Sequence, residues 1–185
     1  MIQDSQQNLE FDKPSAEMIQ QFHQRTALHI KMVRGNLIQL NGFLGLEEQA
    51  LLERSRTHDR SKYKSEEKKA YTWLTWQYYQ KSIGNNLKLP SHIKKKIHHA
   101  LKDHSKMNRH HPEYHKNLND MTLLDMAEMI CDWTAIAKEN NSPNNSCRQW
   151  VEQNLDEKWS FPPKKKNIIY QLINELDRRN KASKK

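Results

Sequence analysis

Glycine and proline are scarce in this chain, and this scarcity limits the folds that it can adopt. Only four glycines and six prolines occur among 185 residues. A strand-rich fold needs many tight turns, which usually contain these residue types, whereas long helices need few. Hydrophobic residues make up 35% of the chain and charged residues 29%, so the core must be small. The composition therefore predicts an all-α fold, and the length predicts a single domain.

Apolar residues recur at intervals of three and four in seven stretches, which is typical of helices with one buried face. The expected helices cover residues 16–41, 46–62, 66–81, 91–110, 122–137, 143–155 and 163–180. Proline, glycine or polar clusters separate most of them. We therefore expect a flexible arm over residues 1–13, one helical domain of about seven helices over residues 14–180, and a basic tail over residues 181–185.

The chain carries a large positive charge. Lysine and arginine number 31 against 22 acidic residues, which gives a net charge of +9, and runs of three lysines occupy residues 94–96 and 164–166. A surface of this kind attracts polyanions such as nucleic acid. A nucleic-acid-binding helical protein is therefore one function that the sequence leaves open.

The two cysteines, Cys131 and Cys147, are too few for a disulfide framework or a four-thiolate metal site. The first residues do not resemble a secretion signal, and no stretch reaches the roughly 18 apolar residues that span a bilayer. These features predict a cytoplasmic protein with no membrane partner.

Two of the ten histidines continue the apolar stripes of expected helices. His29 lies four residues before Val33, and His58 lies seven residues after Leu51. Burial of an imidazole without a partner costs about 1–3 kcal/mol, so each should have one. For either histidine taken alone, a hydrogen bond to the backbone inside the core is the simpler interpretation.

Carboxylates accompany these histidines. Asp59 follows His58 directly, and Asp132 lies partly on the inward face of the expected helix 122–137. Imidazole and carboxylate ligands together suit Mn, Fe, Zn or Ni, and Mg where imidazoles are fewer. The candidate ligands of a divalent metal ion are thus His29, His58, Asp59 and Asp132.

His29, the pair His58-Asp59 and Asp132 follow one another in the order H…HD…D, which resembles the signature of the HD-domain superfamily of metal-dependent phosphohydrolases. The resemblance covers about residues 25–175. It implies an all-helical fold in which these four residues are metal ligands and Asp59 is able to bridge two metals. The segments HDRSK at 58–62, HSKMNRHHPEY at 104–114 and EMICDW at 128–133 resemble an uncharacterised phage and bacterial branch of the superfamily.

The same segments are similar to the HDxGK and HH elements of the HD-GYP phosphodiesterases, although Ser61 replaces the glycine and no GYP follows. The resemblance therefore does not extend to a cyclic dinucleotide substrate. Within the branch, His104 and His111 would complete a second metal site, with His110 as the competing choice. Residues seven apart on an unbroken helix lie about 10 Å apart along its axis. We therefore expect a helix break between residues 108 and 112.

The resemblance implies a phosphohydrolase whose metal activates a water molecule, and whose substrate is a nucleotide or another phosphorylated small molecule. Its cofactor would be one or two divalent ions per chain, of Mn, Fe, Mg, Ni, Co or Zn. Asp59 and Lys62 are the expected catalytic residues, because a cation at Lys62 could neutralise a phosphate oxygen or the leaving group. Lys62 is also a candidate for substrate binding. The other candidates for substrate binding are Asn108, Tyr114 and Arg34.

Two alternatives accompany this interpretation. Lys62 could instead be a solvated side chain near a helix C-terminus, where the helix dipole favours a cation. The whole chain could be an HD scaffold that keeps the ligands but binds a nucleotide or a partner without turnover. The sequence predicts no oligomeric state.

Overall fold

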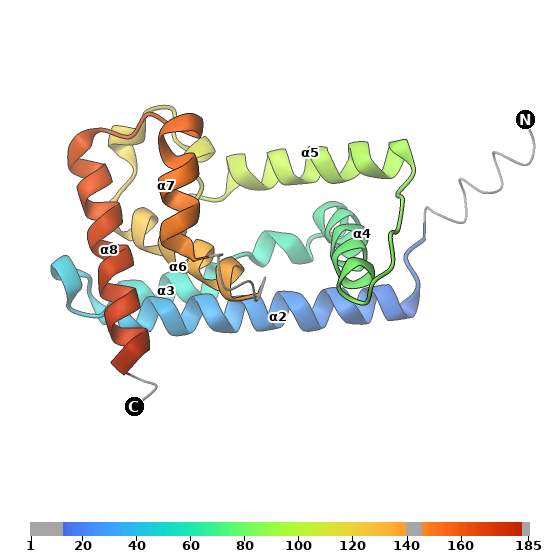
Figure 1. Ribbon diagram of the computed structural model, residues 1–185, viewed down its shortest axis with the longest axis horizontal. Helices are drawn as coiled ribbons and strands as arrows, with labels where there is room; N and C mark the ends of the chain where they lie inside the picture. The colour runs from blue at the N-terminus through green and yellow to red at the C-terminus, as the bar shows by residue number, and fades with distance from the viewer. Residues whose placement is uncertain (1–12, 140–145, 183–185) are drawn as a thin grey trace, which may run out of the picture. The chain divides into compact units, whose positions relative to one another are not determined.

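The computed structural model describes residues 13–139 and 146–182 (Figure 1). This part of the chain contains seven α-helices and no strand, which confirms the prediction of an all-α fold. The helices are α2 (Ala16–Gln39), α3 (Glu48–Thr57), α4 (Ser65–Ser82), α5 (Ser91–Met107), α6 (Leu123–Glu139), α7 (Cys147–Lys158) and α8 (Pro163–Ala182). Short 3-10 segments are η1 (Phe43–Gly45), η2 (Arg60–Tyr63), η3 (Pro112–Tyr114) and η4 (Leu118–Asp120).

The chain forms two compact units, each made from two stretches of sequence. Of the described residues, unit 1 comprises 13–28 and Asp59–His104, and unit 2 comprises His29–His58, 105–139 and 146–182. The boundaries fall inside α2, inside α5 and at the peptide bond between His58 and Asp59. The expectation of one domain over residues 14–180 stays a prediction.

Unit 1 has a small core between its helices. Its buried hydrophobic residues are Met18, Ala70, Trp73, Leu89, Ile93, Ile97 and Ala100. Of the aromatic residues of α4, Trp73 belongs to this core and Trp76 packs against it, whereas Tyr78 is exposed. On α5 the buried positions Ile93, Ile97, Ala100 and His104 are spaced by four, three and four residues, which is one face of a helix. The same periodicity that buries the isoleucines therefore turns His104 inward.

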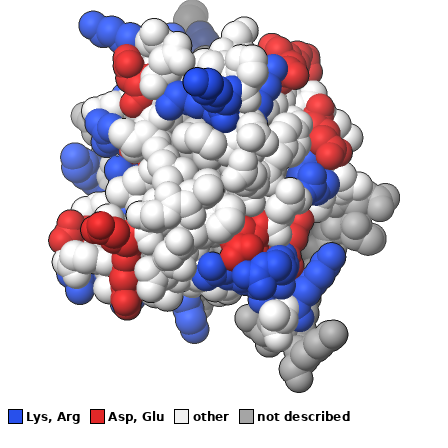
Figure 2. Space-filling view, turned by 90° about the vertical axis from the view of Figure 1, so that its left-hand side faces the viewer, with Lys and Arg blue, Asp and Glu red and all other residues white. Residues whose placement is uncertain are grey.

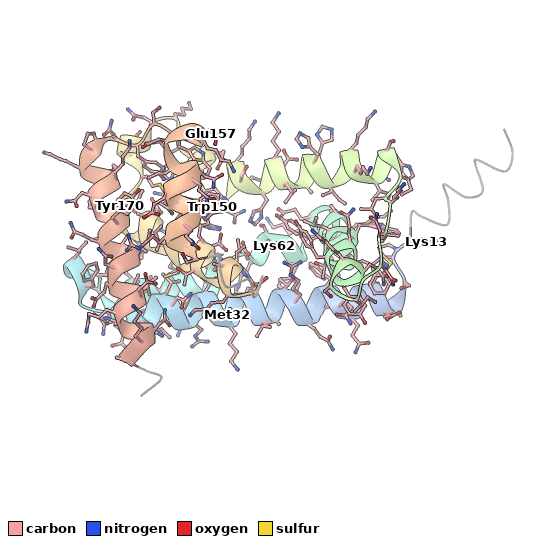
Figure 3. The ribbon with its side chains drawn as sticks, in the orientation of Figure 1. Lys13, Met32, Lys62, Trp150, Glu157 and Tyr170 are labelled. Atoms are coloured by element: carbon pink, nitrogen blue, oxygen red, sulfur yellow. The ribbon has the colours of Figure 1, made fainter. Side chains whose placement is uncertain are left out.

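Unit 2 is built around α6, which packs against α3, α7 and α8. Ten residues of α6 are buried, so this helix has almost no solvent face in its central turns. Trp150 on α7 and Tyr170 on α8, labelled in Figure 3, pack against the core. On the face drawn in Figure 2, basic and acidic side chains surround an uncharged centre. Three acidic residues of α6, Asp125, Glu128 and Asp132, are buried with the apolar ones and need partners.

The helix that the sequence predicts over residues 46–62 is shorter than expected. α3 ends at Thr57, because His58 leaves helical geometry with φ −50° and ψ 127°. Asp59 follows with φ 55° and ψ 15°, a left-handed conformation that Asp adopts more easily than most residues. The prediction that His58 and Asp59 lie on a helix is therefore wrong. Lys62 lies instead on η2, where its backbone N–H donates to the Asp59 carbonyl at 3.0 Å.

The other helix ends agree more closely with the sequence. α5 ends at Met107, and residues 108–111 are not helical, which confirms the expected break. Ser146 caps α7 through a reciprocal pair of hydrogen bonds with Gln149. The expected start of this helix at Pro143 lies outside the described residues, as do residues 1–12 of the arm and residues 183–185 of the tail. α8 itself continues to Ala182.

No helix in the described part of the chain combines the length and the apolar character that crossing a bilayer requires.

Candidate metal centre

Three of the expected ligands lie together in unit 2. His29 Nε2 is 2.9 Å from Asp132 Oδ1 and 3.5 Å from His58 Nε2. The distance from His58 Nε2 to Asp132 Oδ1 is 3.8 Å. All three residues are at most 5% exposed. Ligand atoms from α2, from the end of α3 and from α6 thus converge at one buried point, and this group could hold a metal ion.

Two glutamates contact the Nδ1 atoms of these imidazoles, on the side of each ring away from Asp132. Glu139 Oε1 lies 2.6 Å from His29 Nδ1, and Glu128 Oε1 lies 2.8 Å from His58 Nδ1. A carboxylate only accepts hydrogen bonds when it is ionised, so each Nδ1 must carry the hydrogen and donate it. The Nε2 atoms of both rings face Asp132, and the 2.9 Å contact between His29 Nε2 and Asp132 Oδ1 is a hydrogen bond when that nitrogen is protonated as well.

Asp132 is the carboxylate between these rings. Burial raises the pKa of Asp132, but the hydrogen bond with His29 and the charges of His29, His110 and His58 outweigh burial and hold it well below its usual range. The carboxyl group is therefore ionised at neutral pH, which is the form that binds a metal ion.

Glu128 also anchors the centre to α3. Its Oε2 accepts a hydrogen bond from Arg54 Nη1 at 2.9 Å, and its Oε1 lies 3.4 Å from His110 Nδ1. The His110 ring is buried. Its centroid lies 4.7 Å from that of the His58 ring and 4.2 Å from that of the half-buried His111 ring. His58, His110 and Glu128 form another group in unit 2 that could hold a metal ion.

Asp125, one turn before Glu128 on α6, fixes the start of the helix. It exchanges hydrogen bonds with Thr122, its backbone N–H donating to Thr122 Oγ1 at 3.1 Å and its Oδ2 accepting from the Thr122 N–H at 3.0 Å. Arg109 donates to both carboxylate oxygens, at 3.2 and 3.0 Å, and Arg54 approaches Oδ1 at 2.9 Å. Burial raises the pKa of Asp125, but the bonds from Arg109 and Thr122 outweigh it, so the pKa lies below its usual value.

Asp59 belongs to a second cluster, which lies within unit 1. His104 Nε2 is 3.1 Å from Asp59 Oδ1, and Lys62 Nζ is 2.5 Å from Asp59 Oδ2. Lys62, labelled in Figure 3, also lies over the ring of Tyr71 at 5.0 Å. On the other side of His104, Nδ1 is 3.0 Å from Glu67 Oε2. Burial lowers the pKa of His104, but the bonds to Asp59 and Glu67 outweigh it and raise the pKa above its ordinary value.

The remaining candidates lie at the surface or in turns. Arg34 is exposed on α2. Tyr114 is 38% exposed, and the Arg109 guanidinium covers its ring at 5.3 Å. Asn108 is half-buried, and its carbonyl accepts the His111 N–H at 3.0 Å. Roles for these three residues in substrate binding stay predictions, as does a second metal site that combines His104 with His110 or His111.

The cysteines are unsuited to this centre. Both are buried, and burial raises the pKa of Cys147 to about 12 and that of Cys131 well above its usual value. Because the thiolate is the form that binds a metal, neither cysteine competes with the nitrogen and oxygen ligands.

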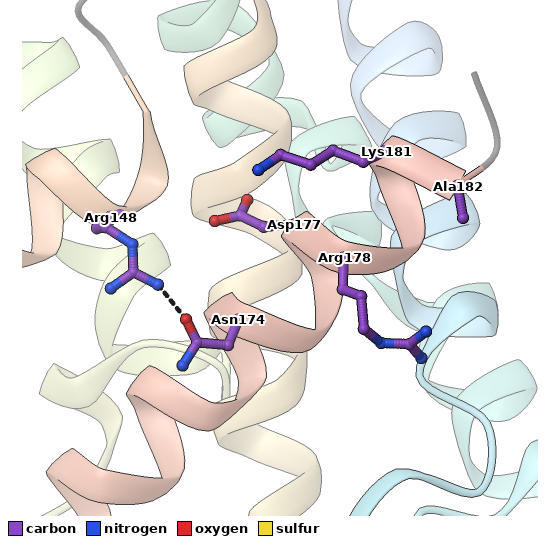
Figure 4. A pocket seen from close by; sticks show the side chains of 6 residues that line it. All are labelled: Arg148, Asn174, Asp177, Arg178, Lys181 and Ala182. Carbon is purple, nitrogen blue, oxygen red and sulfur yellow. Dashed lines mark hydrogen bonds between the residues drawn. The ribbon is translucent and has the colours of Figure 1, made fainter. Parts of the chain in front are cut away.

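A surface pocket in unit 2 lies apart from these residues (Figure 4). The side chains that line it are Arg148, Asn174, Asp177, Arg178, Lys181 and Ala182. Arg148 donates a hydrogen bond to Asn174, and Arg178 pairs with Glu175. None of the candidate ligands lines this pocket, so it is not part of the metal centre.

Glu128, Glu139 and Glu67 are site residues that the sequence reasoning missed. On α6 the acids Asp125, Glu128, Asp132 and Glu139 are spaced by three, four and seven residues, which places them on one helical face. That spacing was a usable signal. Glu67 gave none, because it stands in the charged run Glu66–Lys69, which is typical of a solvated surface.

Residues 18–175 match a family of unknown function, DUF5662. The chain belongs to this family. Comparison with curated proteins and with solved structures finds no match. The DUF5662 match extends from α2 to α8 and includes both clusters, so the family shares the part of the chain in which the candidate ligands lie.

Proposed function

We propose that this DUF5662 member is a metal-dependent phosphohydrolase that acts on a nucleotide or another phosphorylated small molecule. The observation that carries the proposal is the convergence of His29 Nε2, His58 Nε2 and Asp132 Oδ1 within 3.8 Å of one another. A divalent cation bound at this point would take the place of the proton between His29 Nε2 and Asp132 Oδ1, with the two imidazole nitrogens and the carboxylate oxygen as its ligands. A set of nitrogen and oxygen donors fits divalent ions such as Mn, Fe, Co, Ni and Zn.

Asp59 would be the fourth ligand. It is 1% exposed and joined to His58 by one peptide bond, and consecutive Cα atoms lie about 3.8 Å apart. The order of His29, His58, Asp59 and Asp132 along the chain also resembles the HD-domain signature, which supports the same assignment.

The chemistry divides between the metal ion and the chain. A divalent ion bound here would supply an activated water and a Lewis acid for attack at phosphorus. Glu139 and Glu128 keep His29 and His58 in the orientation that directs Nε2 toward Asp132. Lys62 provides a positive charge beside Asp59, and such a charge stabilises a phosphate oxygen or a leaving group as negative charge develops.

The first test is elemental analysis of the purified protein before and after dialysis against a chelator. We expect a divalent metal in the untreated protein. A panel of phosphomonoesters and phosphodiesters, assayed with Mn, Mg, Co or Ni, should then show hydrolysis only when metal is present.

The Asp132→Asn variant should lose both the metal and the activity. Asp120→Asn is the matched control, because Asp120 is an exposed carboxylate on η4. Equal metal content in both variants would contradict the assignment of the centre. Metal binding without any product would favour a scaffold that binds its ligand without turnover.

A further inference from the structure

We propose that the outer face of α5 binds the sugar–phosphate backbone of nucleic acid. The buried stripe of this helix runs through Ile93, Ile97 and Ala100. Lys95, His99 and Lys102 each follow one of these residues by two positions. Two residues turn an α-helix by about 200°, so this second stripe lies opposite the core.

The exposed side of α5 in unit 1 is strongly basic. Its exposed basic side chains are Lys94, Lys95, Lys96, His98, His99 and Lys102. Asp103 is the exposed acid on the same stretch of helix, so four lysines stand against one carboxylate. From Lys95 to Lys102 the axis rises about 10 Å, and duplex DNA carries one charge for roughly each 1.7 Å of its length. Several phosphates therefore fall within the length of this face.

The chemistry of the face favours a nucleic acid over a membrane. A helix that lies in a membrane interface inserts its apolar side. On α5 that side is already packed, since Ile93 and Ile97 belong to the core cluster that contains Trp73. Most of what remains outside is lysine, whose ammonium groups suit phosphates at regular spacing and lack the planar guanidinium group that binds base edges at two points.

The second run of three lysines provides a comparison. Lys165 Nζ on α8 donates to the Met121 carbonyl, and Lys166 pairs with Asp156. Lys165 and Lys166 thus make contacts within unit 2. The proposed surface is independent of the metal centre, because none of its residues is a candidate ligand.

The test is fluorescence anisotropy of a labelled DNA duplex of about two helical turns, titrated with the full chain at about 50 mM and about 200 mM salt. Each lysine that contacts a phosphate contributes about 0.9 to the slope of log affinity against log salt. In the variant Lys94→Gln/Lys95→Gln/Lys96→Gln the slope should therefore fall by up to about 2.7. Over a fourfold change in salt this slope difference corresponds to a factor of about 40 in affinity.

The variant Lys164→Gln/Lys165→Gln/Lys166→Gln is the matched control, since each triple variant lowers the net charge from +9 to 9 − 3 = +6. The control should keep the wild-type slope. Circular dichroism should show both variants folded, and Lys95→Gln/Lys102→Gln repeats the test at positions opposite the core.

Three results would overturn the proposal. The wild-type chain could fail to bind the duplex at the lower salt concentration. The control could lose as much slope as the α5 variant, which would mean that total charge and not this face causes the attraction. Polyglutamate could compete as well as DNA at equal charge, which would indicate an acidic protein partner instead.

Discussion

The contact between Glu139 and His29 is the most direct place to test how the chain prepares its candidate metal centre. Glu139 Oε1 lies 2.6 Å from His29 Nδ1, and its side chain is only 11% exposed. Replacement by glutamine keeps the size of the side chain and removes the charge. The amide either accepts more weakly from Nδ1 through its oxygen or donates to Nδ1 through its NH₂ group, which moves the imidazole hydrogen to Nε2. Both arrangements weaken His29 as a ligand.

The expected loss of metal affinity in the Glu139 variants follows from the kind of hydrogen bond that is lost. Hydrogen bonds to charged groups contribute about 1.5–3 kcal/mol, and neutral ones contribute about 1 kcal/mol. The difference of about 0.5–2 kcal/mol corresponds to about a two- to thirtyfold loss of metal affinity in Glu139→Gln. Glu139→Ala removes the partner altogether and should approach the hundredfold loss that is typical of ligand-orienting residues.

The assay is isothermal titration of the chelator-treated protein with Mn²⁺ or Zn²⁺. Glu53→Gln serves as the control, because Glu53 is an exposed residue of α3 that contacts Gln49. Circular dichroism should show that the variants remain folded. Wild-type metal affinity in both Glu139 variants would refute the reasoning, since His29 would then be positioned by its packing alone.

Three further results are expected. Asp59→Ala should abolish any metal-dependent hydrolysis and keep the helical circular dichroism, because Asp59 lies between α3 and η2 and its carboxylate is a proposed ligand. Unchanged turnover would exclude Asp59 from catalysis. Removal of metal should lower the melting temperature by about 5–10 °C, since a ligand at 100 times its Kd stabilises the native state by about 2.7 kcal/mol. Asp125→Asn should lower the free energy of unfolding by about 1.5–3 kcal/mol at pH 7, because the buried carboxylate loses its charged hydrogen bonds with Arg109, whose own side chain is 46% exposed and stays solvated. Since the pKa of Asp125 in the folded chain lies below the usual 3.8, its contribution is complete above pH 3.8 and is lost as the pH falls through the folded value. Denaturant titrations between pH 2 and 7 should therefore show a weaker acid dependence in the variant than in the wild type.

The helices could be predicted because their signal is local. On α5, Ile93, Ile97 and Ala100 recur at the spacing of one helical face, and no distant partner is needed to recognise it. The break after Met107 is local as well, because proline at position 112 disfavours helical geometry before it. Helices and most of their ends therefore follow from short stretches of sequence.

The partners of the candidate ligands depend on contacts across the fold and were harder to predict. His29 and His58 could be recognised as inward-facing from their own helices. Their hydrogen-bond partners lie 110 and 70 residues further along the chain, at Glu139 and Glu128. Only the acidic spacing on α6 pointed to them. A prediction that first asked which buried carboxylates share a helical face with Asp132 would have found both.

The wrong prediction for His58 and Asp59 has a physical reason that the sequence itself contained. Both residues are almost fully buried, at 2% and 1% exposure, although they are adjacent. Successive side chains on a helix point about 100° apart, so a helix with a solvent face does not easily turn two neighbours toward different buried partners. The left-handed conformation of Asp59 lets the two adjacent side chains reach different buried partners. His58 bonds to Glu128, while Asp59 contacts His104 and Lys62. A non-glycine residue in this conformation is unusual and is often found where function requires it. An adjacent histidine and aspartate that both need buried partners therefore indicate the end of a helix, and here α3 ends at that point.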